Sequence, residues 1–161
     1  MDAFEAELTA LLPRLRRFGR ALARDAADAD DLVQVALERA LKARAQWVPG
    51  TRLDSWMLKI MRNCWIDETR SRSRRARSFA PEEDGLAVRD PSADPEQAAA
   101  MRDVDRAMAA LPEQQREVIA LVLVEGLAYR EAADVLEIPI GTLTSRLTRG
   151  RQALVQMLEA A

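Results

Sequence analysis

The chain has 161 residues with 24 basic and 26 acidic side chains, a length that suits one medium domain or two small ones. With no histidine, a single cysteine (Cys64) and only isolated glycines, it cannot form a zinc finger, a histidine-activated nucleophile, an internal disulfide or a phosphate-binding glycine loop, so we expect no enzyme, no metal, no cofactor and no small-molecule ligand. No apolar run reaches 18 residues, and the N-terminus is acidic where a secretory signal is positive, which together predict a cytoplasmic protein without membrane contact.

Three helices are predicted in the first half of the chain. Apolar residues recur every three or four positions from Phe4 to Leu22, and Pro13 predicts a break or kink near Leu12. Acidic residues 28–31 suit the start of a second helix that runs towards Trp47, and a loop at 49–50 follows. A third helix begins near Thr51 or Asp54, and its buried stripe is Leu53, Trp56, Met57, Ile60 and Cys64.

A change of composition divides the chain. Residues 77–95 contain three prolines, one glycine and the acidic cluster 82–84, a composition that cannot bury enough apolar surface to order itself. This segment is predicted to be a flexible acidic linker. It separates a first module, residues 1–76, from a second module, residues 96–161.

The second module is also predicted to be helical. Its first stripe consists of Met101, Val104, Met108 and Leu111. Pro112 suits the first turn of the next helix, which ends at Gly126. A short helix at 129–136, a tight turn at 137–139 and a last helix at 141–158 complete the chain. No segment alternates as a strand does, so the predicted fold class is all-α, with two small helical domains and a helix-turn-helix at the end of the second.

Charge is distributed unevenly along the chain. The net charge is +4 over residues 1–76, −4 over 77–100 and −2 over 101–161. Six arginines lie between positions 62 and 77, and three arginines with no acid lie between 142 and 152. Two basic patches are typical of a protein that binds a polyanion, although solvated helix faces have similar compositions.

The last predicted helix has two distinct faces. Projection at 100° per residue puts five apolar residues on one stripe: Leu143, Leu147, Leu154, Met157 and Leu158. The opposite stripe holds Thr144, Ser145, Thr148, Arg149 and Gln152, flanked by Arg146 and Arg151. Such side chains can reach base edges in a major groove while the flanking arginines hold phosphates. The alternative is an ordinary amphipathic helix with a polar exterior.

The third predicted helix also carries a polar face, formed by Lys59, Arg62, Asn63 and Arg70. With the loop 47–53 as a wall, this face suits a single strand with one base turned out. Trp47 and Trp65 have the chemistry to stack on bases, although packing is the expected role of both, and Cys64 is expected in the core.

Four segments, in order, resemble those of bacterial RNA polymerase sigma factors of the extracytoplasmic-function (ECF) type. Residues 28–34 (DADDLVQ) are similar to the segment that docks on the polymerase clamp, and residues 55–68 to the minus-ten recognition helix. Residues 111–118 (LPEQQREV) resemble the opening of the minus-thirty-five domain. Residues 129–133 and 138–147 resemble its helix-turn-helix.

This resemblance implies a two-domain sigma factor that binds core RNA polymerase and directs it to promoters, commonly under the control of an anti-sigma protein. The residues that would face the polymerase are Asp30, Asp31, Gln34 and Glu38. Those that would hold the melted minus-ten strand are Asn63 with Lys59, Arg62 and the loop 47–53. Ser145, Thr148 and Arg149 would read the minus-thirty-five duplex, with Arg146 and Arg151 on phosphates.

Two departures and two alternatives accompany this resemblance. Glu137 occupies a turn position that often carries glycine, and the two threonines at 144 and 148 leave the minus-thirty-five preference open.

One alternative is a sigma-mimicking protein that titrates an anti-sigma factor without binding DNA. A stand-alone helix-turn-helix repressor is the other, but it leaves the first module unexplained.

Overall fold

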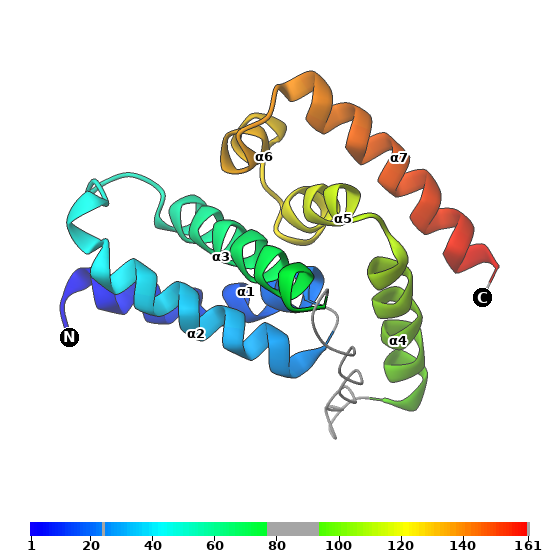
Figure 1. Cartoon of the computed structure of the whole chain (residues 1–161), viewed down its shortest axis with the longest axis horizontal. Coiled ribbons are helices and arrows are strands. Elements are labelled where there is room, and N and C mark those ends of the chain that lie inside the picture. Colours follow the sequence, from blue (N-terminus) through cyan, green and yellow to red (C-terminus); the bar gives the residue numbers. More distant parts are fainter. Residues whose placement is uncertain (24, 77–93, 161) are drawn as a thin grey trace.

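The computed structural model describes residues 1–23, 25–76 and 94–160, and all regular structure in these ranges is helical, which confirms the all-α prediction (Figure 1). The first module consists of α1 (Ala3–Leu22), α2 (Ala26–Lys42), the 3₁₀ turn η1 (Arg44–Gln46) and α3 (Leu53–Ala76). The second module consists of α4 (Pro95–Ala110), α5 (Glu113–Ile119), the π-helical turn η2 (Ala120–Val124), α6 (Tyr129–Leu136) and α7 (Ile140–Glu159). Most of the predicted linker, residues 77–93, lies outside the described residues.

Aspartates cap the first two helices. Asp2 Oδ1 accepts a hydrogen bond from the Glu5 N–H at 2.9 Å, and Asp25 Oδ1 accepts one from the Asp28 N–H at 2.7 Å. Each carboxylate satisfies an N–H that has no partner within the helix. Consequently α2 begins at Ala26, before the predicted acidic start at 28–31, and Asp28 lies in its first turn.

Of the predicted break or kink near Leu12, the break is wrong, because α1 continues through Pro13. Pro13 lies on the exposed face of α1, so water can hydrate the carbonyl that loses its N–H partner. On the opposite face Leu8, Leu15 and Phe18 are buried on both sides of the proline. Burial of this stripe holds the two halves of α1 in one helix.

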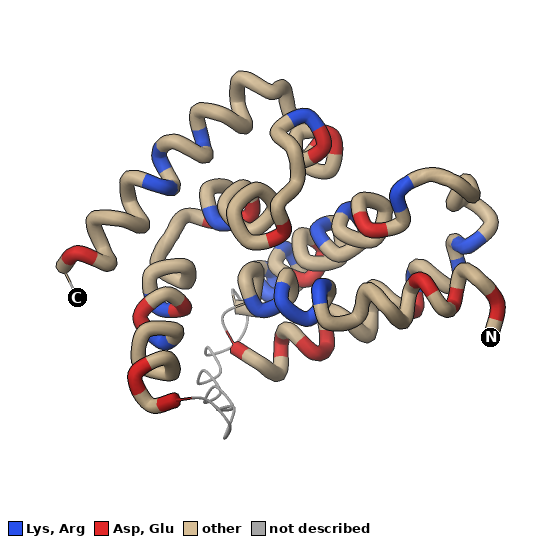
Figure 2. Tube along the Cα trace, turned by 180° about the vertical axis from the view of Figure 1, so that it is seen from behind, with Lys and Arg blue, Asp and Glu red and all other residues tan. Residues whose placement is uncertain are grey.

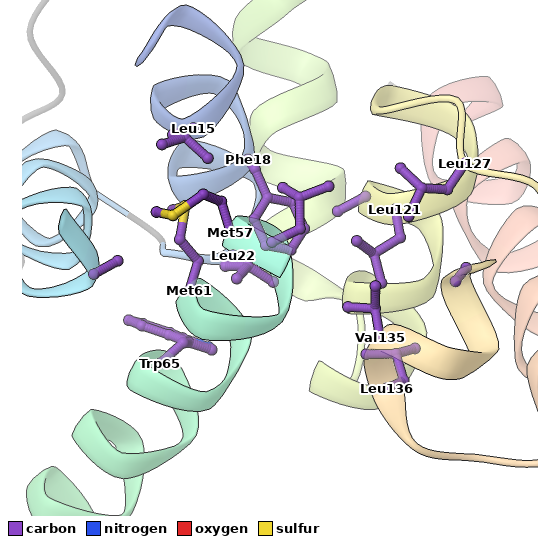
Figure 3. Packing of buried hydrophobic residues seen from close by; sticks show 14 of the residues in the cluster. Leu15, Phe18, Leu22, Met57, Met61, Trp65, Leu121, Leu127, Val135 and Leu136 are labelled. Atoms are coloured by element: carbon purple, nitrogen blue, oxygen red, sulfur yellow. The ribbon is translucent and has the colours of Figure 1, made fainter. Parts of the chain in front are cut away.

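One hydrophobic core runs through both modules. Figure 3 shows Phe18, Leu22 and Met57 of the first module beside Leu121 and Val135 of the second within this cluster. Trp65 and Cys64 are buried, as packing residues are, whereas Trp56 and Ile60 are only partly buried. Met101 was predicted to lie on the apolar stripe that packs in the core; this prediction is wrong, since its side chain is 58% exposed.

The second helix of the second module ends in an unusual turn. After α5, the Glu125 N–H donates to the Ala120 carbonyl at 2.9 Å, a bond that spans five residues instead of four. Gly126 then adopts a φ of +71°, and the Leu127 N–H donates to the Leu121 carbonyl at 3.0 Å. This left-handed glycine ends the helix at the predicted position.

The two modules pack against each other. Helix α3 contacts α6, and α1 contacts α4, α5 and η2. In Figure 1 the bundle of α1–α3 lies beside α4–α7, with α3 and α6 facing each other. Among the described residues, no helix combines the length and apolarity needed to cross a bilayer.

Candidate nucleic-acid interfaces

Helices α6 and α7 form a helix-turn-helix with a left-handed residue in the turn. Glu137 has φ 56° and ψ 44°, and its N–H donates to the Asp134 carbonyl at 3.2 Å. The Ile138 N–H donates to the Ala133 carbonyl at 3.1 Å, which closes the end of α6. A glutamate therefore adopts the conformation that glycine supplies in many such turns, at a cost of about 1 kcal/mol.

Helix α7 is anchored on its inner face. Leu143 and Leu147 are buried, and Gly150 lies directly against α5, where an added Cβ would be 3.1 Å from Cγ1 of Ile119. Because Gly150 has no side chain, α7 can cross α5 at close range. This crossing fixes which residues of α7 face outward.

The outward face of α7 includes the polar residues predicted from the projection, whereas Leu158, predicted for the inward stripe, is exposed. Thr144, Ser145, Thr148, Arg149 and Arg151 are exposed, and Arg146 is half-buried. Figure 2 shows the basic positions along the middle of α7, with an acidic one only near its C-terminal end. Thr144 donates its hydroxyl hydrogen to the Ile140 carbonyl at 2.9 Å, and Thr148 donates to the Thr144 carbonyl at 3.0 Å. Towards a ligand, both hydroxyls are therefore acceptors.

A groove of about 440 Å³ lies between the start of α5 and the first turns of α7. It is lined by Pro112, Gln114, Gln115, Gly141, Thr142, Ser145, Arg146 and Arg149. The lining includes two guanidinium groups and no carboxylate among the described residues. Its composition suits phosphate and base-edge contacts.

The polar face of α3 differs from that of α7, because two of its cations form ion pairs with carboxylates. Lys59 Nζ lies 2.9 Å from Glu137 Oε1, and Arg62 Nε donates to Glu117 Oε2 at 3.2 Å. Both carboxylates belong to the second module. Asn63 is half-buried and Arg70 is exposed further along the helix. The structure thus brings Lys59 and Arg62 together with the second module.

Two pKa shifts reflect these contacts. Burial raises the pKa of Glu117, and the hydrogen bond from Arg62 only partly offsets this effect. The hydrogen bond from Lys59 lowers the pKa of the exposed Glu137. The Arg62–Glu117 pair is therefore desolvated, whereas the Lys59–Glu137 pair is solvated.

Trp47 packs within the first module. The centroid of its ring lies 5.4 Å from that of the Phe4 ring, and the two ring planes form an angle of 52°. The guanidinium carbon of Arg44 lies over the same Phe4 ring, 4.8 Å from its centroid. The indole is half-buried. This packing accounts for Trp47 without a base, although the loop at 48–52 next to it is mostly exposed.

The predicted polymerase-binding residues Asp30, Asp31, Gln34 and Glu38 are exposed on α2, opposite its buried residues. A groove of about 280 Å³ lies between this face and α3, lined by Asp28, Asp31, Leu32, Gln34, Val35, Glu38, Cys64, Trp65, Glu68 and Arg72. The exposed Val35 adds an apolar contact, and Arg72 pairs with Asp28 at one side. An acidic surface with an apolar centre suits a basic protein partner.

Three buried charged residues were not predicted. Glu125 has a fully buried carboxylate, and Arg14 and Arg17 of α1 lie 3.1 and 3.0 Å from it. Arg116 is buried and donates to the carbonyls of Leu111, at 2.9 Å, and Leu22, at 3.1 Å. Glu117 is the third. In the sequence these charges only adjoin apolar residues, as Glu117 precedes Val118 and Glu125 follows Val124, and this does not reveal their burial or their partners.

Asp54 links the start of α3 to α1. Burial would raise the pKa of Asp54, but hydrogen bonds from Arg52, Arg14 and the Ser55 N–H outweigh it and lower the pKa to about 2. Arg14 thereby contacts both Asp54, at 2.9 Å, and Glu125. Among the described residues, no cluster of three or more metal-binding side chains is found.

Comparisons with known proteins agree with the geometry. The family models of sigma-70 region 2 and sigma-70 region 4 match residues 8–75 and 101–154. The ECF RNA polymerase sigma factor EcfG of Rhodopseudomonas palustris is 33% identical over 159 residues, which cover 98% of this chain and 86% of EcfG. SigM of Mycobacterium tuberculosis, also an ECF sigma factor, is 33% identical over 145 residues, 90% of this chain and 71% of SigM.

A solved structure has the same arrangement of helices. The sigma factor RpoE of Bartonella quintana, crystallised with the anti-sigma factor NepR, superposes with a TM-score of 0.88 at 29% identity. The match covers 99% of this chain and 98% of RpoE. The resemblance inferred from the four sequence segments is confirmed.

Proposed function

Since the chain belongs to the ECF RNA polymerase sigma factors, we propose that it binds core RNA polymerase through α2 and directs it to promoters through α3 and α7. The observation that carries the DNA-binding part is the groove between α5 and α7, which is lined by Arg146 and Arg149 and lacks carboxylates among the described residues. The protein has a role in transcription initiation in the cytoplasm and needs no catalytic group of its own.

The minus-thirty-five duplex is assigned to α7. Arg149, Ser145 and Thr148 read base edges, while Arg146 and Arg151 contact phosphates. Exposure of this face and the rigid anchoring of α7 through Leu143, Leu147 and Gly150 support the assignment. Because the threonine hydroxyls act as acceptors, they suit donor groups on bases.

The melted minus-ten strand is assigned to α3. Lys59, Arg62 and Arg70 contact phosphates, and Asn63 reads a base turned out beside the loop 47–53. Cations on one helix face, next to a largely exposed loop, support this assignment.

The polymerase is assigned to the acidic face of α2. Asp30, Asp31, Gln34 and Glu38 are free of the core, and the adjoining groove contains the exposed Val35. We further propose that an anti-sigma protein controls the chain by covering such faces, as RpoE, of the same fold, is bound by an anti-sigma factor. The alternative of a titrating mimic without DNA binding is disfavoured by the cationic groove at α7.

The decisive experiment is transcription in vitro with purified core polymerase on genomic DNA, followed by mapping of the RNA 5′ ends. The wild-type chain is expected to produce a small set of start sites that core polymerase alone does not produce. Arg149→Ala should abolish these sites, whereas Arg106→Ala, on the exposed side of α4 outside the groove, should retain them. Start sites no more selective than those of core polymerase would contradict the proposal.

A further inference from the structure

Two threonines lie near the middle of the outward face of α7. Projected at 100° per residue, Thr144 and Thr148 lie one turn apart, with Arg149 towards one edge of the exposed face and Arg151 towards the other. When a helix lies in a major groove, its flanks are close to the sugar–phosphate strands and its centre is close to the base edges. The two threonines therefore hold positions from which base sequence is read.

The hydroxyl groups of both threonines are held by the helix backbone. Thr144 donates to the Ile140 carbonyl at 2.9 Å, and Thr148 donates to the Thr144 carbonyl at 3.0 Å. Because a hydroxyl bound to the carbonyl four residues earlier restricts χ1, the methyl group on the same Cβ also has a fixed direction. Each exposed side chain therefore offers a ligand a fixed methyl group and an acceptor oxygen, but no donor.

The first turn of α7 extends this apolar character. Ile140, one turn before Thr144, is 50% exposed. Between them in the sequence is Gly141, where an added Cβ would have no atom within 4 Å, so the backbone is open to close approach by a ligand. Methyl groups and bare backbone thus lie between the cationic edges of this helix, whose basic positions Figure 2 shows.

Among the four bases, thymine is the one that presents a methyl group in the major groove. Its C5-methyl is recognised by apolar contact, and the threonine methyl is one of the groups that supply it. The acceptor oxygen of the same side chain can bind a base amino group at the same time. A methyl contact therefore adds to the base-edge contacts of the proposed function and does not replace them.

We propose that Thr144 and Thr148 are specificity-determining residues that contact the C5-methyl groups of thymines in the minus-thirty-five duplex through their own methyl groups. This inference rests on the proposed function, because it needs α7 to lie in the major groove of that duplex. It specifies the base class, thymine, and the atom of the side chain that selects it.

The test uses the full chain bound to core polymerase and promoter fragments taken upstream of the mapped start sites. Each thymine of the minus-thirty-five element is replaced in turn by deoxyuridine, which lacks only the C5-methyl, and binding of the labelled fragment is titrated. The wild-type chain should bind about fourfold more weakly where a contacted thymine is replaced, the factor expected for one methyl group.

Three kinds of variant identify the threonine atom responsible. Thr144→Ser and Thr148→Ser remove the methyl and keep the hydroxyl, so each should bind thymine and deoxyuridine equally at its own position. Thr144→Val and Thr148→Val keep a methyl and remove the hydroxyl, so they should retain the preference. The matched control is Thr9→Ser on the exposed face of α1, where the hydroxyl donates to the Glu5 carbonyl at 2.7 Å in the same way. This control should behave as wild type.

The outcomes separate this inference from the proposed function. An element without a sensitive thymine, a deoxyuridine effect that persists in the serine variants, or a preference lost in the valine variants overturns the methyl contact. If Arg149→Ala still abolishes the mapped start sites in that case, the assignment of the duplex to α7 stands. If Arg149→Ala retains those sites, that assignment fails and the methyl contact fails with it.

Discussion

The outward faces of α3 and α7 carry similar side chains but differ in their surroundings. On α7, Arg149 and Arg151 are exposed, and no ion pair to them is found in the part of the chain that the structure describes. On α3, Lys59 and Arg62 pair with carboxylates of the other module. Cationic helix faces in one sigma factor can therefore differ in availability, which depends on tertiary contacts and not on the helix itself.

The largest effect on the free energy of unfolding is expected from a substitution at the contact between the two modules. Glu125→Lys would place a cation between Arg14 and Arg17, in a position where the carboxylate is fully buried. We expect the free energy of unfolding to fall by about 3–5 kcal/mol, measured by denaturant titration. Glu125→Gln, which keeps a hydrogen-bond acceptor, should have a smaller effect. Equal stability of Glu125→Lys and wild type would show that this contact does not hold the modules together.

Arginine truncation on the two faces sharpens the comparison. Arg62→Ala should lower the free energy of unfolding by about 2–4 kcal/mol, because it leaves Glu117 buried without its cation. Arg149→Ala should leave stability unchanged and weaken binding of the minus-thirty-five duplex by about 1–3 kcal/mol. Thermal unfolding and duplex titration measure the two quantities. Similar losses of stability in both variants would contradict the difference between the faces.

Asp54 allows a test by pH. Its pKa is lowered to about 2, so the native carboxylate stabilises the fold above the unfolded value near 3.8 and loses this effect as the pH falls through 2. Asp54→Asn should cost about 1–2 kcal/mol at neutral pH. It should also flatten the decline in stability between pH 4 and 2. An unchanged pH profile would exclude Asp54 from the link between α1 and α3.

The smallest effect on stability is expected from a substitution of Lys59. Its partner Glu137 is exposed, so water screens the pair, and Lys59→Ala should shift the unfolding midpoint much less than Arg62→Ala. Its effect on the salt dependence of single-strand binding should be comparable to that of Arg62→Ala, since the proposed function gives each side chain one phosphate contact. A midpoint shift as large as that of Arg62→Ala would mean that both pairs are desolvated.

Local patterns in the sequence predicted α6, the turn and α7 well, because their apolar stripes and turn residues act over a few positions. The break at Pro13 was wrong because burial on the opposite face of α1 outweighs one missing hydrogen bond. Contacts between modules were beyond prediction. Arg14 and Glu125 are 111 positions apart, and an isolated charge looks the same in sequence whether it is solvated or paired.

The family was found from four segments in order, but the positions of the site residues depend on packing. Arg149 is exposed as projected, whereas Arg62, on an equally clear polar stripe, faces another module. A helical projection gives the direction of a side chain from its own axis. It contains no information about which other helix lies in that direction.

The π-helical turn at 120–124 has a consequence for the evolution of this fold. One additional residue in a helical turn rotates everything after it by about 100° around the axis. In this chain that rotation determines whether Glu125 points at α1 or elsewhere. A single-codon deletion within this turn would leave every charged residue of the chain in place and yet redirect the Glu125 carboxylate, so insertions and deletions of one residue are a route by which relatives could gain or lose the coupling between their halves.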